Sequence, residues 1–271
     1  MRTPQSDDEA LRERLLEELR QSLVDNPKAL GFLDFLEQSQ ELQSLITHGN
    51  TLVVERLNYN DHGLTHSRLA SRNALNILEL LRARGVEPTV VKEKWGNYQD
   101  AQLVVLGAAY LHDLGNAVHR EKHYLHSLYL ATPILREYFN ANFPCGIAQR
   151  LLAQTLECIY SHDEAVQCLS VEAGCVTIGD GADMAGGRAR IPFSLGQPDI
   201  HALSALAIRT VTIREGEDRP VRVEVEMTGS AGIFQVQEVL GLKIRSSGLT
   251  DHVEVCWKVL GNEEEMSGVE R

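Results

Sequence analysis

The sequence of 271 residues lacks features that would point to several classes of protein. No run approaches the ~18 apolar residues that a membrane-spanning helix requires, so we expect no membrane partner. Basic residues are too few for a bulk nucleic-acid binder, because 26 Lys and Arg face 38 Asp and Glu, a net charge of −12. The five cysteines form no C-x-x-C pair, and an odd, scattered count is typical of reduced thiols in the cytosol.

The N-terminal segment is acidic and polar, without the apolar stretch of a signal peptide, so we expect a cytoplasmic protein. Hydrophobic residues make up 43% of the chain and charged residues 24%, which is ordinary for a soluble globular protein. This composition excludes global disorder, a collagen-like chain and a disulfide scaffold. The length is compatible with one large domain or two smaller ones.

Apolar residues recur at helical spacing through most of the chain up to about residue 184. This spacing predicts helices over 7–24, 28–47, 49–58, 64–84, 99–112, 122–139, 146–161 and 169–184. The segment 99–112 is almost wholly apolar, so we expect its helix to be buried on all sides. Gly85 is placed to end the preceding helix, and 86–98 is expected to be a loop.

The pattern changes towards the C-terminus. The segment 186–199 is rich in Gly, Pro and polar residues, which is typical of a loop or linker. Alternating residues predict strands over 207–213, 221–227 and 251–257, and 232–244 has helical spacing. We therefore predict a mainly α protein: a helical bundle with an N-terminal helical extension over 1–195, and a small C-terminal α+β unit (β-β-α-β) over 200–271.

Histidines are concentrated in two short windows. Six of the ten lie there, namely His62, His66, His112, His119, His123 and His126. Asp113 follows His112 where the apolar helix is predicted to end. Adjacent helical residues point about 100° apart, so both can serve one site only at such an end, which Leu-Gly-Asn at 114–116 supplies. A histidine beside a carboxylate suits divalent metals such as Mn, Fe, Zn or Ni.

The order of these residues resembles the HD superfamily of metal-dependent phosphohydrolases over roughly residues 60–190. Members carry an early histidine at a helix start, a His-Asp doublet and a late aspartate. These match His66 in THSRLASRNAL, His112-Asp113 in AAYLHDLGN, and Asp180 in IGDGADMAGGR. The resemblance implies an HD-domain helical bundle in which these four side chains hold a metal ion, with Asp183, one turn later, as the alternative late aspartate.

Two-metal members of that family, including the HD-GYP branch, add histidines between the doublet and the late aspartate. His123 in HYLHSLYLATPIL and His162 in IYSHDEA match such positions. Asp163 stands where HD-GYP members carry a second histidine, and the GYP signature is absent, so specificity for cyclic dinucleotides is not implied. His119 and His126 lie one helical turn from His123 and remain alternatives for its role. His162 could instead cap helix carbonyls.

The resemblance also implies roles in the reaction. Asp113 would bridge two ions, and a neighbouring histidine or lysine would steady the leaving oxygen. The candidate catalytic residues are Asp113, His119 and His126. The candidate substrate-binding residues are His62, Arg120, Lys122 and Arg188. Arginine binds phosphate oxygens in a bidentate manner, although simple solvation explains these basic residues equally well.

The sequence therefore predicts a hydrolase that uses metal-activated water on a phosphomonoester or phosphodiester. We expect a nucleotide or another small phosphorylated metabolite as substrate and two divalent ions (Mn, Fe, Zn, Ni or Mg) as cofactors. Two alternatives remain open: a non-catalytic HD module that binds and senses a nucleotide, and a di-iron HD-type oxygenase.

The edges of the C-terminal sheet need covering, either by the helical part or by a second subunit, and we predict a homodimer.

Overall fold

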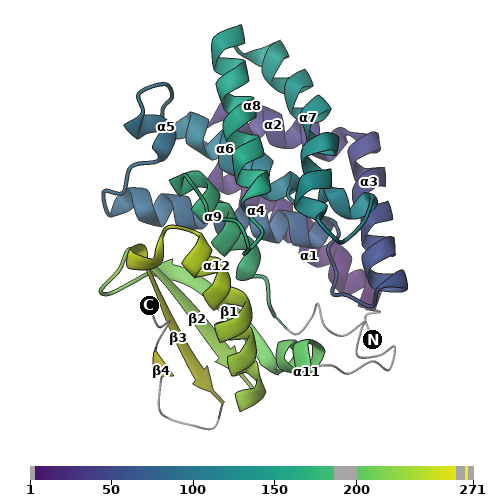
Figure 1. Cartoon of the computed structure of the whole chain (residues 1–271), viewed down its shortest axis with the longest axis vertical. Coiled ribbons are helices and arrows are strands. Elements are labelled where there is room, and N and C mark those ends of the chain that lie inside the picture. The colour runs from purple at the N-terminus through teal and green to yellow at the C-terminus, as the bar shows by residue number, and fades with distance from the viewer. Residues whose placement is uncertain (1–3, 186–199, 261–265, 268–271) are drawn as a thin grey trace.

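The computed structural model describes residues 4–185, 200–260 and 266–267, and the linker expected at 186–199 lies outside them. The α-helices are α1 (Pro4–Ser22), α2 (Pro27–Gln38), α3 (Gln40–Thr51), α4 (Leu64–Ala83), α5 (Thr89–Lys92), α6 (Tyr98–Leu111), α7 (His123–Asn142), α8 (Cys145–Tyr160), α9 (Val171–Gly181), α11 (Ile200–Ala207) and α12 (Gly241–Ser246). The strands are β1 (Ile208–Glu215), β2 (Val221–Met227), β3 (Val253–Val259) and β4 (Met266–Ser267). This mainly α architecture with a small C-terminal sheet confirms the expected fold class (Figure 1).

Helix α6 lies at the centre of the helical body, where it packs against α2, α4, α8 and α9. Every residue from Leu103 to Leu111 is buried, as expected from the nearly continuous apolar run. Asn97 caps the N-terminus of this helix by accepting from the backbone N–H of Asp100, whose carboxylate in turn accepts from the N–H of Asn97. The capped start and the apolar surface together fix α6, which brings its C-terminal end, and the doublet, into the protein interior.

Local capping explains where the helices depart from the prediction. The single helix expected over 28–47 is two helices, because Ser39 adopts an extended conformation and its hydroxyl caps the N-terminus of α3 by accepting from Leu42 N–H. The short helix α5 forms within the expected loop over 86–98. The buried carboxylate of Glu172, on α9, accepts the N–H groups of Thr89 and Val90 at the start of α5.

The C-terminal sheet has the strand order β1-β2-β3-β4. β1 and β2 form an antiparallel hairpin, and β2 and β3 pair in parallel. Parallel strands require a crossover, which a π-helical segment (Gln235–Leu240) and α12 provide. The expected β-β-α-β order is therefore confirmed, with the two-residue strand β4 added beside β3.

The two faces of the sheet differ in chemistry. Val221, Val223 and Val225 are buried and belong to the apolar core that extends into the helical body. The opposite face carries ion pairs across neighbouring strands, such as Lys258 with Glu226 at 2.5 Å. Charged pairs of this kind favour solvent contact, so this face is the more exposed of the two.

The C-terminal unit docks on the helical body. Helix α12 lies against α9 (Figure 1). Asn76 of α4 donates a hydrogen bond to the carbonyl oxygen of Ile213 on the edge strand β1. Docking thus covers part of the surface of the C-terminal unit.

The homodimer stays a prediction. Light scattering should show two chains per particle, and a monodisperse monomer would contradict the homodimer. None of the helices in the described residues is long and apolar enough to cross a membrane.

Candidate metal centre

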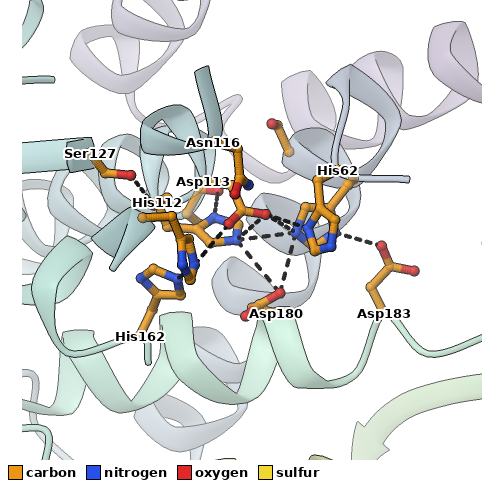
Figure 2. Close-up of polar contacts among 12 residues, drawn as sticks. His62, His112, Asp113, Asn116, Ser127, His162, Asp180 and Asp183 are labelled. Carbon is orange, nitrogen blue, oxygen red and sulfur yellow. Dashed lines mark hydrogen bonds and ion pairs between the residues drawn. The ribbon is translucent and has the colours of Figure 1, made fainter. Parts of the chain in front are cut away.

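Five helices bring polar side chains together at their ends (Figure 2). The residues are His66 in the first turn of α4, His112 and Asp113 after α6, His123 at the start of α7, His162 after α8, and Asp180 in the last turn of α9. These side chains are largely buried, and that of Asp180, the most exposed of them, is 12% exposed. Residues up to 114 positions apart in the sequence therefore share one buried site.

Four side chains form what we call the first donor group: His66, His112, Asp113 and Asp180. The Nε2 atoms of His66 and His112 are 3.1 Å apart. His66 Nε2 lies 3.3 Å from Asp113 Oδ2 and 3.3 Å from Asp180 Oδ1. His112 Nε2 lies 3.5 Å from each of the same two oxygens. The four potential ligand atoms thus surround one point.

His123 and His162 form the second donor group, together with the other oxygen of Asp113. The Nε2 atoms of the two histidines are 3.0 Å apart, and His123 Nε2 is 3.2 Å from Asp113 Oδ1. Asp113 therefore directs Oδ2 to the first group and Oδ1 to the second. The two oxygens of this one carboxylate therefore face different donor groups.

The Nδ1 atoms of the four histidines determine which ring nitrogen carries the proton. Nδ1 of His66 lies 2.7 Å from Asp183 Oδ2. In the other three histidines Nδ1 faces a backbone carbonyl oxygen: that of Ala109 at 2.9 Å for His112, that of Arg120 at 3.1 Å for His123, and that of Ile159 at 2.6 Å for His162. Carbonyl and carboxylate oxygens only accept, so each Nδ1 is the donor. In the neutral rings, each Nε2 then presents a lone pair to the centre of the site.

Lone pairs and carboxylate oxygens that converge in this way repel one another unless a cation lies among them. Ligands about 2.0–2.2 Å from one ion lie roughly 3.0–3.4 Å apart, close to the separations between these atoms. His66, His112 and Asp180 place their ligand atoms within 4.8 Å of one another, as do His112, Asp113 and His162. The donor set therefore fits a divalent metal ion.

The electrostatic environment favours ionised carboxylates and a neutral His162. Burial alone would raise the pKa of Asp113, but His62 and His112 hold it well below its usual range. Burial likewise opposes ionisation of Asp180, but the charge of Lys243 lowers its pKa well below the usual range. Burial and the neighbouring His112 and His123 lower the pKa of His162 well below its ordinary value. The carboxylates are therefore ionised and His162 is neutral.

Two of the predicted substrate-binding residues lie beside Asp113. His62 Nδ1 is 2.6 Å from Asp113 Oδ2, and His62 also places a ligand atom within 4.8 Å of those of His66 and Asp113. Arg120 Nη1 is 3.4 Å from Asp113 Oδ1, and the arginine side chain is 27% exposed. Arg120 thus links the buried donors to the surface.

The other candidates lie elsewhere. His119 is exposed and its Nδ1 accepts from the N–H of Glu121, whereas His126 is half-buried. Lys122 is exposed and has a left-handed backbone (φ 56°) immediately before α7. These three residues belong to neither donor group, and Arg188 lies outside the described residues. Asp183, the alternative late aspartate, hydrogen-bonds His66 Nδ1.

Sequence reasoning missed two residues at this site. Lys243 of α12 places Nζ 2.7 Å from Asp180 Oδ2, and Asp180 raises its pKa against the effect of burial. A lysine in an amphipathic segment 63 residues away gives no signal of this contact. Asn116 is buried beside the doublet, and its Nδ2 has no hydrogen-bond partner within the described part of the chain. The position of Asn116 three residues after Asp113 could have indicated that it lies at this site.

Gly115 keeps α7 close to the doublet. Its N–H donates to Ser127 Oγ, which donates to the carbonyl oxygen of His112. A Cβ at this position would lie 2.0 Å from the backbone oxygen of His123. Gly115→Ala should therefore displace the start of α7, lowering metal content and reducing the free energy of unfolding by about 1–3 kcal/mol.

Elemental analysis and thermal unfolding measure this effect. Gly146→Ala is the matched control, because a Cβ at Gly146 of α8 meets nothing within 4 Å. The control should retain the wild-type metal content and stability. Wild-type metal content in Gly115→Ala would show that this close approach does not position His123.

Comparison with known proteins identifies a relative. No protein-family model matches the sequence, and no solved structure matches it. The uncharacterized protein MJ1020 of Methanocaldococcus jannaschii is 41% identical over 238 residues, which cover 88% of this chain and 91% of that protein. Identity over nearly the whole of both chains shows common descent, and the chain belongs to the same family as MJ1020.

Proposed function

We propose that this protein is an HD-type metal-dependent phosphohydrolase. Its substrate is a phosphomonoester or phosphodiester of a nucleotide or another small phosphorylated metabolite. The observation that carries the proposal is the convergence of four histidine Nε2 lone pairs on the two oxygens of Asp113. The order His66, His112-Asp113, His123, His162 and Asp180 along the chain supports it, because it resembles that of two-metal HD proteins.

The donor set defines what each residue contributes. Bound divalent ions lower the pKa of water and polarise a phosphoryl oxygen. Asp113 holds the two donor groups at a fixed separation through its two oxygens. Asp183 and three backbone carbonyls orient the histidine rings, so that their lone pairs need no rearrangement when a cation binds.

Arg120 favours an anionic substrate. Its guanidinium lies beside Asp113 and over the ring of Tyr59, whose side chain is exposed. Arginine can bind two phosphate oxygens at once, and the overall negative charge of the chain makes a local cation important for attracting an anion. This cation favours a phosphorylated substrate over the neutral substrate that a di-iron oxygenase could take.

A metal-supplemented screen tests the proposal. Purified protein is incubated with Mn²⁺, Fe²⁺, Zn²⁺, Ni²⁺ or Mg²⁺ and a panel of nucleotides and phosphorylated metabolites, and phosphate or nucleotide release is measured. We expect release from at least one substrate class, and none after treatment with a chelator. Nucleotide binding without hydrolysis would favour the sensing module, and oxygen consumption with two bound irons would favour the oxygenase.

The number of ions is a separate prediction. The purified protein should contain close to two transition-metal ions per chain, and His123→Ala or His162→Ala should lower that number to about one. Elemental analysis of protein kept away from chelators measures it. His119→Ala is the matched control and should keep both ions, because His119 lies outside both donor groups. A measured content of one ion in the wild type would mean that only the first donor group binds metal.

A further inference from the structure

A lysine of the C-terminal unit enters the metal centre. Lys243 Nζ donates to Asp180 Oδ2 at 2.7 Å and to the carbonyl oxygen of His162 at 2.8 Å. The Lys243 side chain is 11% exposed, and Glu164 is a further acidic neighbour, with Oε2 at 4.0 Å. One ammonium group therefore contacts a residue from each donor group.

The chain is shaped to admit this side chain. Gly174 and Gly181 are seven residues apart and lie on the same face of α9, towards the C-terminal unit. A Cβ at Gly181 would lie 2.8 Å from Cδ of Lys243, and one at Gly174 would lie 2.6 Å from the carbonyl oxygen of Ser247. Gly181 thus leaves room for the stem of Lys243 beside Asp180, and Gly174 lets the backbone at Ser247 approach α9 closely.

The ammonium divides the two oxygens of Asp180 between different partners. Oδ2 accepts from Lys243 Nζ. Oδ1 lies 3.3 Å from His66 Nε2 and 3.5 Å from His112 Nε2, and Figure 2 shows Asp180 and His112 facing each other. We propose that Lys243 is a positioning residue of the proposed metal site: it reserves Oδ2 of Asp180, so that only Oδ1 faces the metal, and its charge offsets that of the carboxylate. The inference rests on the proposed metal site and assigns the C-terminal unit a part in it.

Two consequences of removing the ammonium act in the same direction. Without Lys243, Asp180 can turn and offer both oxygens to a cation. The charge balance also changes, because among the described arginines and lysines Arg120 alone would still pair with one of the two carboxylates, that of Asp113. Loss of a nearby positive charge strengthens cation binding. We expect the affinity for a cation to rise on the order of tenfold, the size of effect that one nearby charge has on a neighbouring ionisable group.

Cobalt binding tests the inference without an activity assay. Co²⁺ is titrated into metal-free, full-length wild-type protein and Lys243→Met, and its visible absorption reports both affinity and the number and geometry of donors. Lys243→Met keeps an unbranched side chain without the charge. We expect about tenfold tighter Co²⁺ binding and an altered absorption band. Lys243→Arg retains the charge and should restore the wild-type behaviour.

Lys258→Met is the matched control, because Lys258 lies on the exposed face of the sheet, where it pairs with Glu226. It should behave as the wild type. Lys243→Gln is measured in parallel, with circular dichroism to select folded variants, so that misfolding of one variant does not leave the question open. Unchanged or weaker Co²⁺ binding by a folded, uncharged variant overturns the inference. Absence of Co²⁺ binding by the wild type overturns the proposed metal site itself.

Discussion

Asp113→Asn is expected to lose bound metal and the proposed phosphohydrolase activity together, while the helical fold remains. Asp113 directs one oxygen to each donor group, and an amide supplies only one acceptor and no negative charge. Its NH2 group would point at histidine lone pairs, where it can donate a hydrogen bond but cannot bind a cation. Metal-based stabilisation of a transition state is worth several kcal/mol, so we expect activity to fall by on the order of 10³-fold.

The experiment combines elemental analysis, an activity assay and circular dichroism. Asp113→Ala and His112→Ala should show the same joint loss. The matched control is Asp163→Asn, because Asp163 follows His162 but its Oδ1 accepts from the N–H of Ala165. The control should keep the wild-type metal content. Full activity in Asp113→Asn or Asp113→Ala would rule out Asp113 as the bridging carboxylate.

The histidines of the donor groups could be predicted because features of short chain segments indicate them. The nearly continuous apolar run of α6 ends at the doublet, so both side chains can face one site there. His123 begins α7, and His162 directly follows the last residue of α8 and its C-cap, Ser161. These are properties of short segments, which periodicity and motif order describe well. The helical body was predictable for the same reason.

Contacts between distant segments were not predictable. The spacing of Asp180 and Asp183, three residues apart, makes either a plausible ligand. Only the folded arrangement shows that Asp180 faces both His66 and His112, whereas Asp183 hydrogen-bonds the far side of the His66 ring. Lys243 was missed because its contact with Asp180 depends on the docking of α12 against α9. Single-sequence patterns contain no information about such docking.

Glu37→Ala is expected to destabilise the fold strongly. Arg68 donates to both carboxylate oxygens of Glu37, at 2.8 and 2.5 Å, and the two side chains are 9% and 10% exposed. Arg68 also donates to the carbonyl oxygen of Arg12, and Tyr110 donates to Glu37. The network thus joins α1, α2, α4 and α6. Arg68 and Tyr110 lie two residues from His66 and His112, respectively, so it also supports the helices that carry the first donor group.

Removing one partner leaves the other charge buried without compensation, and this is why the loss should be large. We expect Glu37→Ala to reduce the free energy of unfolding by about 3–5 kcal/mol, measured by urea denaturation of the metal-free protein. Asp34→Ala breaks the exposed pair with Arg20 and should cost no more than about 1 kcal/mol. The double variant Glu37→Met/Arg68→Met removes both charges and should recover much of the loss, since no unpaired charge remains. A double variant no more stable than Glu37→Ala would show that the loss comes from packing rather than from the unpaired guanidinium.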